Sequence, residues 1–492
     1  MKKGLRALVY ATLILIGYAY LHEQVPFLQK HLHSLPTLSQ VLLVESPQEI
    51  LYTEVIQEED CEEEPADSLS KGTVDKGNIS KPPSAKKAKY TGQEHLYHYF
   101  GQLRQLSVEG RKKKVRIAYF GDSMIEGDLI TQSLRNQLQE EFGGRGVGFV
   151  PITSVTAGFR NSIGHVFSQN WVHHSFLRPQ LPEGYQYGIS GDVFLTTASE
   201  GQETPWVQFT GSKQFRRTQY WQRIYLYHGL PGPADTLTDP EEPVVVVTTR
   251  NIEGDWRTDS MQLKKARKVN RLTLSSRPAD VARLDFELPD NFPIYGLSFE
   301  GKAGVYLDNF AARGNSGLNL TVIPSSILRG FNYYIGYDLV ILHYGLNVVH
   351  PERTNFKSYQ KGMTRVLKHL KANLPNASFL LVSVSDKSVK VDGQMVTDPS
   401  VPLVVEAQRK AAEASGVAFF NLYEAMGGRN SMVKWAESDP SLAQKDYTHM
   451  NHKGGEKLSK IIYRWLQKEY DMYLEGNLEG STPSSLEELS LR

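Results

Sequence analysis

Two blocks of alternating strand and helix patterns flank a long stretch that has little helical periodicity. Apolar runs typical of buried strands occur at 115–120, 338–343, 378–383 and 417–422. Helical spacing of apolar residues is found at 125–142, 356–374 and 404–414, and a last helix is predicted at 453–470. Buried strands that alternate with helices indicate an α/β fold, with a parallel sheet covered by helices.

The stretch 171–306 has a different pattern. Short runs such as VVVVTT, RLTLSS and YGLSFEG alternate there with turn residues. This pattern is typical of all-β structure and predicts an inserted β-sandwich or jelly roll. Its aromatic residues either form a surface on which sugars stack or belong to the sandwich core. They include Trp206, Tyr220, Trp221, Tyr225, Tyr227 and Trp256.

The amino terminus predicts export. Basic residues precede a mostly apolar run at 7–21, which is the pattern of a signal segment. Because no small-x-small cleavage site follows, we expect 1–24 to remain as a signal-anchor in the inner membrane, with the rest of the chain in the periplasm. Secretion after cleavage is the alternative. The polar, low-complexity residues 25–92 predict a flexible linker.

Composition excludes several other classes of function. The 492 residues contain 55 Lys and Arg against 54 Asp and Glu, so the chain lacks the basic character of a nucleic-acid-binding protein. Cys61 is the single cysteine, which excludes a disulfide framework and a cysteine-based metal site. We expect neither a cofactor nor a metal.

A Gly121-Asp122-Ser123 motif follows the first predicted strand. Ser123 is therefore predicted at a strand-to-helix turn, with the amino terminus of a helix beneath it. Unpaired backbone N–H groups at such a position stabilise negative charge on a substrate oxygen. The alternative is an ordinary serine that caps a helix.

A carboxylate and an imidazole lie just before the last predicted helix, at Asp446 and His449. A serine hydroxyl is a weak nucleophile unless a base takes its proton, and that base has to be oriented by another group. Asp446 and His449 supply both functions. The alternative is a loop with a capping Asp and a solvent-facing His, and we interpret the neighbouring His452 in that way.

Two further segments supply candidate oxyanion donors. Asn347 follows the strand predicted at 338–343, at the carboxyl edge of the sheet, where ligands bind in such folds. Gly314 lies in an Arg-Gly-Asn-Ser-Gly segment, where the lack of a side chain lets a substrate approach the backbone N–H. Each segment by itself is also compatible with a simple turn.

The ordered set Gly-Asp-Ser, Gly, Gly-x-Asn and Asp-x-x-His resembles the four blocks of the SGNH/GDSL hydrolase family. The chain resembles in particular the peptidoglycan and polysaccharide O-acetylesterases, in which a carbohydrate-binding-like β domain separates the first two blocks. The resemblance implies a flavodoxin-like three-layer fold. It also implies that Ser123 is the nucleophile, with His449 and Asp446 as its partners, and that Gly314 and Asn347 join the Ser123 N–H in the oxyanion hole.

The resemblance predicts an esterase that removes acetyl or other short acyl groups from an acylated glycan or cell-wall polysaccharide. An O-acetyltransferase and an inactive glycan-binding or assembly protein are the alternatives. An α/β-hydrolase is less compatible with the sequence, because Ile125 occupies the second glycine of Gly-x-Ser-x-Gly. The expected domains are the signal-anchor 1–24, the linker 25–92, the hydrolase parts 93–170 and 307–471, the β insert 171–306 and a polar tail 472–492.

Overall fold

The computed structural model describes residues 90–197, 203–230, 243–264 and 266–479. All of them belong to one unit, Lys81–Arg492. The predicted signal-anchor and the linker as far as residue 89 lie outside the described residues. Within the described part of the chain, no helix has both the length and the apolar character needed to cross a membrane.

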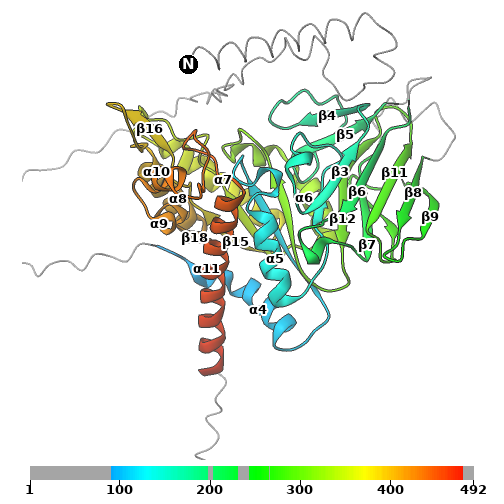
Figure 1. Ribbon diagram of the computed structural model, residues 1–492, viewed down its shortest axis with the longest axis horizontal. Coiled ribbons are helices and arrows are strands. Elements are labelled where there is room, and N and C mark those ends of the chain that lie inside the picture. The colour runs from blue at the N-terminus through cyan, green and yellow to red at the C-terminus, as the bar shows by residue number, and fades with distance from the viewer. Residues whose placement is uncertain (1–89, 198–202, 231–242, 265, 480–492) are drawn as a thin grey trace, which may run out of the picture. The chain divides into compact units, whose positions relative to one another are not determined.

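A five-stranded sheet forms one half of the described structure (Figure 1). Its strands are all parallel, and their order is β13-β1-β14-β15-β18. The strands are β1 (Lys114–Gly121), β13 (Gly304–Ala311), β14 (Leu339–His343), β15 (Ser378–Val382) and β18 (Ala418–Phe420). Four of them coincide with the predicted apolar runs, which are apolar throughout because parallel sheets are buried on both faces. The mixed α/β class is confirmed.

The helices around this sheet form two groups that pack among themselves. One group contains α4 (Tyr97–Ser107), α5 (Thr131–Phe142), α9 (Leu422–Met426) and α11 (His452–Glu479). The other contains α6 (Ser325–Ile335), α7 (Lys357–Asn373) and α8 (Val401–Ser415). A short α10 (Ser431–Glu437) packs beside the hairpin β16 (Ser388–Val391) and β17 (Gln394–Thr397).

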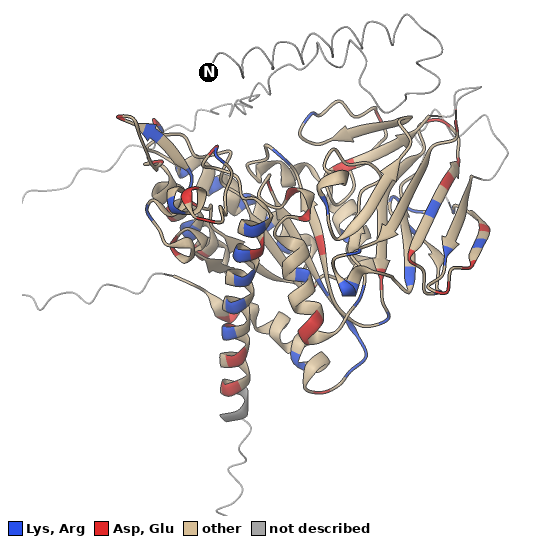
Figure 2. Ribbon diagram, viewed as in Figure 1, with Lys and Arg blue, Asp and Glu red and all other residues tan. Residues whose placement is uncertain are grey.

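The last helix, α11, is held by packing rather than by its charges. Leu458, Ile462, Leu466 and Tyr470 recur every fourth residue and are buried. Figure 2 shows Lys and Arg toward the amino-terminal part of α11 and Asp and Glu toward its carboxyl end. This order of charges opposes the helix dipole, so the apolar stripe has to supply the stability. The helix extends beyond the predicted 453–470.

The helix predicted at 125–142 begins later, at Thr131. Gly127 and Asp128 have φ of 61° and 65°, and a short 3-10 turn, η2 (Glu126–Asp128), occupies this part of the chain. A right-handed helix cannot continue through consecutive left-handed residues. The prediction that a helix amino terminus lies directly beneath Ser123 is therefore wrong.

Two antiparallel sheets make up most of the region between β1 and β13. One has the order β10-β7-β12-β5-β4, with β2 also paired to β12, and the other has the order β3-β6-β11-β8-β9. Their strands are β2 (Gly148–Val150), β3 (Ile163–Phe167), β4 (Trp171–Ser175), β5 (Asp192–Thr196), β6 (Trp206–Gly211), β7 (Arg223–His228), β8 (Val244–Arg250), β9 (Trp256–Gln262), β10 (Asn270–Ser275), β11 (Val281–Glu287) and β12 (Pro293–Glu300). The sheets share a core, in which the rings of Phe209 and Phe299 are 4.9 Å apart.

The outer face of the sheet that contains β7 and β12 packs against α6. Phe331 of α6 lies among Tyr227, Tyr295 and Phe149, with ring centroids 5.4, 5.6 and 6.2 Å away. Such aromatic contacts stabilise beyond the area they bury. The antiparallel sheets are therefore fixed to the helices of the parallel sheet.

A buried ion cluster provides a second link between these parts. Arg116 of β1 binds both carboxylate oxygens of Asp308 on β13, at 2.8 and 2.7 Å, and Glu300 on β12 at 2.5 Å. Tyr337 also donates to Asp308 (2.8 Å). Burial alone would raise the pKa of Glu300, but the charges of Arg116 and Lys114 hold it at about 2. The cluster joins β12 of the antiparallel sheets to two strands of the parallel sheet.

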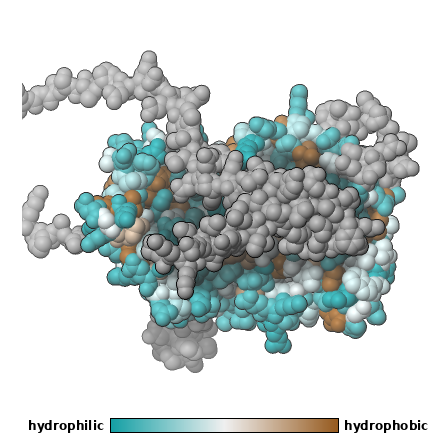
Figure 3. All heavy atoms as spheres, turned by 45° about the horizontal axis from the view of Figure 1, so that its top comes forward, coloured by the Kyte–Doolittle hydropathy of each residue, from teal (hydrophilic) through white to brown (hydrophobic). Residues whose placement is uncertain are grey.

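The named aromatic residues of the 171–306 stretch do not form one exposed platform. Trp221, Tyr225 and Tyr227 are buried, and two others lie beneath arginine guanidinium groups. Trp256 also lies beneath a guanidinium group, that of Arg250, but 58% of its surface is exposed. On the face seen in Figure 3, the visible hydrophobic residues form small separate patches among hydrophilic ones. The core interpretation therefore holds for the three buried aromatics, Trp221, Tyr225 and Tyr227.

Candidate active site

Ser123 lies just beyond the carboxyl end of β1, in a tight turn. The backbone N–H of Glu126 donates to the Ser123 carbonyl (3.3 Å), and that of Ile125 donates to the Asp122 carbonyl (3.3 Å). Gly121 at the end of β1 pairs in register with His343 at the end of β14. The turn therefore presents Ser123 at the carboxyl edge of the parallel sheet, and its side chain is partly exposed.

The structure brings Ser123, His449 and Asp446 into one chain of hydrogen bonds. The Ser123 Oγ is 2.9 Å from His449 Nε2, and His449 Nδ1 is 2.7 Å from Asp446 Oδ2. In the tautomer with its proton on Nδ1, His449 donates to Asp446 and accepts from the Ser123 hydroxyl. This is the arrangement in which an imidazole removes the proton of a serine nucleophile.

Asp446 is held as an ionised carboxylate. Its Oδ1 accepts the backbone N–H groups of Thr448 (2.9 Å) and His449 (3.0 Å), and its Oδ2 faces the imidazole. Partial burial would raise the pKa of Asp446, but the hydrogen bonds from His449 and Thr448 lower it to about 2. The negative charge therefore persists at neutral pH, where it orients His449 and stabilises the imidazolium.

The loop that carries Asp446 and His449 is fixed at several points. The Ser388 N–H donates to the Tyr447 carbonyl (3.0 Å), and the Gln444 N–H donates to the His449 carbonyl (2.8 Å). Tyr447 has a φ of 53°, an unusual value for a residue with a side chain. These contacts join the loop to β16 and position it before α11.

Gly314 and Asn347 lie in adjacent loops at the same edge of the sheet. Gly314 follows β13 and has a φ of 83°, and Asn347 follows β14. The Asn347 Nδ2 donates to the carbonyl of Asn315 (3.0 Å), so the two loops are in contact. Arg313 in turn pairs with Glu126 in the Ser123 turn (2.7 Å). The predicted oxyanion donors thus lie beside the strand that carries Ser123.

Asn347→Ala should reduce turnover roughly 100-fold to 1,000-fold, which is the usual cost of removing one oxyanion donor. The hydrogen bond to Asn315 uses one amide hydrogen, and the other is left for a substrate oxygen. Steady-state hydrolysis of a small activated acetyl ester measures the effect. Asn376→Ala, which removes an exposed amide near the amino end of β15, is the matched control. If both variants keep parental rates, Asn347 is not an oxyanion donor.

Sequence reasoning assigned no role to Asp122, the residue before the candidate nucleophile. Its side chain is buried, and its Oδ1 accepts the backbone N–H of Met124 (3.0 Å). Its Oδ2 has no hydrogen-bond partner among the described residues. Burial raises the pKa of Asp122 to about 6, although the Met124 hydrogen bond and the nearby His449 act in the opposite direction. The Gly-Asp-Ser motif includes Asp122, but a sequence motif does not indicate whether its carboxylate is buried.

Asp122→Asn should stabilise the fold at alkaline pH. The pKa of Asp122 is about 6 in the folded state and ordinarily 3.8. Between these values the folded state binds more protons than the unfolded state, so stability falls as pH rises through that window. Asn keeps the acceptor for Met124 and has no charge, so we expect a gain of roughly 3 kcal/mol at pH 8 and little change below pH 4. Urea unfolding at both pH values tests this. An equal gain at both would contradict the titration argument.

His452 does not contact Ser123 through a hydrogen bond. It is the first residue of α11, and its ring stacks on Phe159 with centroids 4.3 Å apart. The choice of His449 over His452 as the partner of Ser123 agrees with this geometry.

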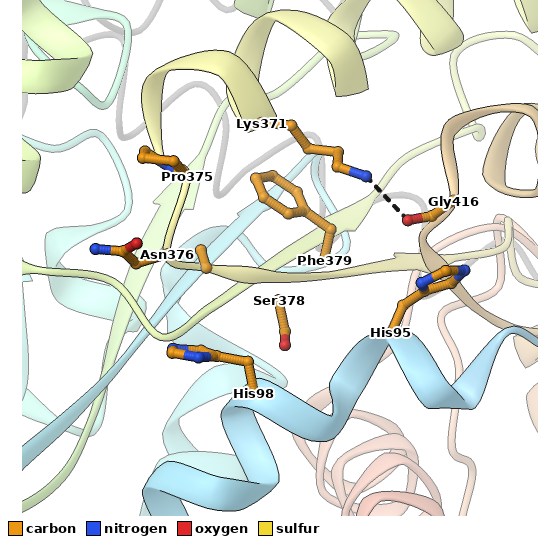
Figure 4. A pocket seen from close by; sticks show the side chains of 9 residues that line it. His95, His98, Lys371, Pro375, Asn376, Ser378, Phe379 and Gly416 are labelled. Atoms are coloured by element: carbon orange, nitrogen blue, oxygen red, sulfur yellow. Dashed lines mark hydrogen bonds between the residues drawn. The ribbon is translucent and has the colours of Figure 1, made fainter.

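A separate pocket of about 260 Å³ lies at the opposite edge of the parallel sheet (Figure 4). Ser378, the first residue of β15, lines it, together with His95, His98 and Lys371. The Lys371 ammonium donates to the carbonyls of Ser415 (2.8 Å) and Gly416 (3.0 Å), at the end of α8. Ser123 follows the carboxyl end of its strand, so this pocket is not part of the candidate active site. Within the described ranges, no group of three or more His, Cys, Asp or Glu side chains is arranged to hold a metal.

Comparison with known proteins places this geometry in a known fold. No protein-family model and no curated protein matches the sequence. Among solved structures, a peptidoglycan O-acetylesterase is similar over 76% of this chain and 96% of its own, with a TM-score of 0.59 and 19% identity. The chain shares the fold of an O-acetylesterase. The predicted resemblance to peptidoglycan O-acetylesterases is therefore confirmed at the level of the fold.

Two other esterases give lower scores. A family two carbohydrate esterase from Cellvibrio japonicus has a TM-score of 0.26 and 9% identity, over 64% of this chain and 99% of that one. An acetyl xylan esterase has a TM-score of 0.25 and 19% identity, over 32% of this chain and 80% of that one. TM-scores this low do not establish a shared fold, so neither likeness supports an argument about this chain.

Proposed function

We propose that this protein is a serine esterase that removes acetyl or other short acyl groups from a glycan outside the cytoplasm. The observation that carries the proposal is the hydrogen-bond chain from Ser123 through His449 to Asp446. It occurs in a chain that shares the fold of a peptidoglycan O-acetylesterase. No other arrangement at this edge of the sheet supplies a nucleophile, a base and an orienting carboxylate together in the described residues.

The mechanism follows from the roles of these three side chains. The Ser123 Oγ attacks the acyl carbonyl while His449 Nε2 takes its proton, and the backbone N–H of Ser123, with Gly314 and Asn347, stabilises the oxyanion. The tetrahedral intermediate collapses, the ester C–O bond breaks, and the imidazolium protonates the departing sugar oxygen. Water, deprotonated by His449, then attacks the acyl-serine, releasing the carboxylic acid and restoring the Ser123 hydroxyl.

We further interpret the parallel sheet as flavodoxin-like. Numbered along the chain among themselves, the strands β13-β1-β14-β15-β18 have the order 2-1-3-4-5, the flavodoxin-like order. The strand order reverses between β1 and β14, where such folds bind ligands, and Ser123 and Asn347 follow these two strands. We interpret the two helix groups as the outer layers and the antiparallel sheets as an insert between β1 and β13.

The substrate and location rest on different observations. A glycan substrate is supported by the fold shared with a peptidoglycan O-acetylesterase. The location depends on the sequence of 1–24 alone, which predicts a signal-anchor in the inner membrane with the esterase in the periplasm, or secretion after cleavage.

Acetate release from O-acetylated peptidoglycan and from other acetylated polysaccharides tests the proposal. We expect the parent protein to release acetate from at least one of these polymers and Ser123→Ala to release none. Adding an unacetylated oligosaccharide distinguishes a transferase, which would move the acetyl group to that acceptor. If the parent protein and Ser123→Ala behave alike on every polymer, the proposed esterase is wrong.

A further inference from the structure

An exposed phenylalanine lies against the turn that carries the candidate nucleophile. Phe159 ends the short 3-10 helix η3 (Ala157–Phe159), between β2 and β3, and 42% of its surface is exposed. A Cβ placed on Gly127 would lie 2.5 Å from Phe159 Cδ1. Glycine at position 127 therefore permits both the left-handed backbone of the Ser123 turn and the close approach of the ring.

Another neighbour of Phe159 is His452, at the start of the helix that follows the loop with the base. His452 stacks on Phe159 with an angle of 25° between the rings, and it lies shortly after His449 in the sequence. The His452 Nδ1 has no hydrogen-bond partner in the described part of the chain. Phe159 thus contacts both segments that meet in the Ser123–His449 hydrogen bond.

The segment around Phe159 is exposed to solvent. A Cβ added to Gly158 would meet no atom within 4 Å, and Val155 in the same segment is almost fully exposed. A large apolar ring left exposed beside the turn that carries Ser123 is suited to a ligand with an apolar face. A pyranose ring has such a face, because its C–H bonds project above and below the ring while its hydroxyl groups lie at the rim.

We propose that Phe159, stacked on His452, is a subsite for a sugar ring next to the ester that Ser123 attacks. This inference rests on the proposed function and specifies how a glycan is positioned in that site. Binding at a place remote from the reacting atoms aligns the acetyl group with Ser123, and a small ester does not use it.

Phe159→Ala and Phe159→Trp separate this role from a structural one. We expect Phe159→Ala to lower kcat/KM for an acetylated oligosaccharide about tenfold or more while sparing p-nitrophenyl acetate, because only the larger substrate reaches the ring. Phe159→Trp should keep activity on the oligosaccharide. Tyr333→Ala, which removes an exposed aromatic residue of α6, is the matched control and should leave both substrates unaffected. Equal loss on both substrates with Phe159→Ala would mean that the ring only supports the Ser123 turn, and no loss on either would also overturn the subsite.

Binding to an uncleaved substrate separates this proposal from the esterase proposal. Calorimetry with Ser123→Ala and the acetylated oligosaccharide should give a Kd that rises about tenfold when Phe159→Ala is added. If the parent protein never releases acetate but this difference in Kd is present, the esterase is wrong and the subsite stands. If Ser123→Ala binds the oligosaccharide equally well with and without Phe159, or does not bind it, the subsite is wrong.

Discussion

Ser123→Ala and His449→Ala should each lower the hydrolysis of p-nitrophenyl acetate by roughly ten-thousand-fold to a million-fold, with the fold intact. The reason is the pair of contacts at 2.9 and 2.7 Å that join Ser123, His449 and Asp446. Without the imidazole, the hydroxyl has no base, and without the hydroxyl, the imidazole has no nucleophile to activate. The double variant should therefore be hardly slower than either single variant.

The control for this prediction is His98→Ala, which removes an imidazole at the opposite edge of the sheet. It should keep the parental rate, and circular dichroism should show the same fold for all variants. A multiplicative loss in the double variant would mean that Ser123 and His449 act independently, which is incompatible with the hydrogen bond between them.

Arg116→Met should lower the free energy of unfolding by about 3 to 5 kcal/mol, the usual cost of removing one partner from a buried ion pair. The guanidinium is fully buried between Asp308 and Glu300, so its loss leaves two carboxylates in the interior without their principal counter-charge. Methionine fills much of the same volume, so the effect reports the charge rather than a cavity. Urea denaturation monitored by tryptophan fluorescence measures the change.

Arg257→Met is the matched control, because Arg257 pairs with Asp259 on the surface of β9. Exposed pairs of this kind contribute little to stability, so its unfolding midpoint should not change measurably. If Arg116→Met were as stable as the parent, the buried cluster would not be what fixes β12 to the parallel sheet.

Four of the five strands of the parallel sheet were predictable, because burial on both faces requires continuous apolar sequence. The runs at 115–120 and 338–343 differ from β1 and β14 only at their ends. The start of α5 was not predictable from periodicity, because left-handed Gly127 and Asp128 interrupt a segment whose apolar spacing is helical. Asp128 takes this conformation while its carboxylate binds Arg135 (2.6 Å), a tertiary contact that local sequence does not reveal.

The candidate site also has some residues that the sequence predicts and others that only the tertiary structure reveals. Motif order was enough to select Ser123, Asp446 and His449, and the structure brings them within hydrogen-bond distance of one another. Sequence reasoning did not single out Asp122 or Phe159. Asp122 is significant because it is buried, and Phe159 because it is exposed beside another segment of the chain. Neither property can be read from a segment without knowing what packs against it.

Covalent labelling of the nucleophile tests the central claim most directly. The protein is incubated with a fluorophosphonate, which reacts with activated serines, and is then digested and analysed by mass spectrometry. We predict a single adduct on the peptide that contains Ser123, much slower labelling in His449→Ala, and none at that position in Ser123→Ala. No adduct on the parent protein, or an adduct on another serine that forms equally fast in Ser123→Ala, would contradict the assignment of Ser123 as an activated nucleophile.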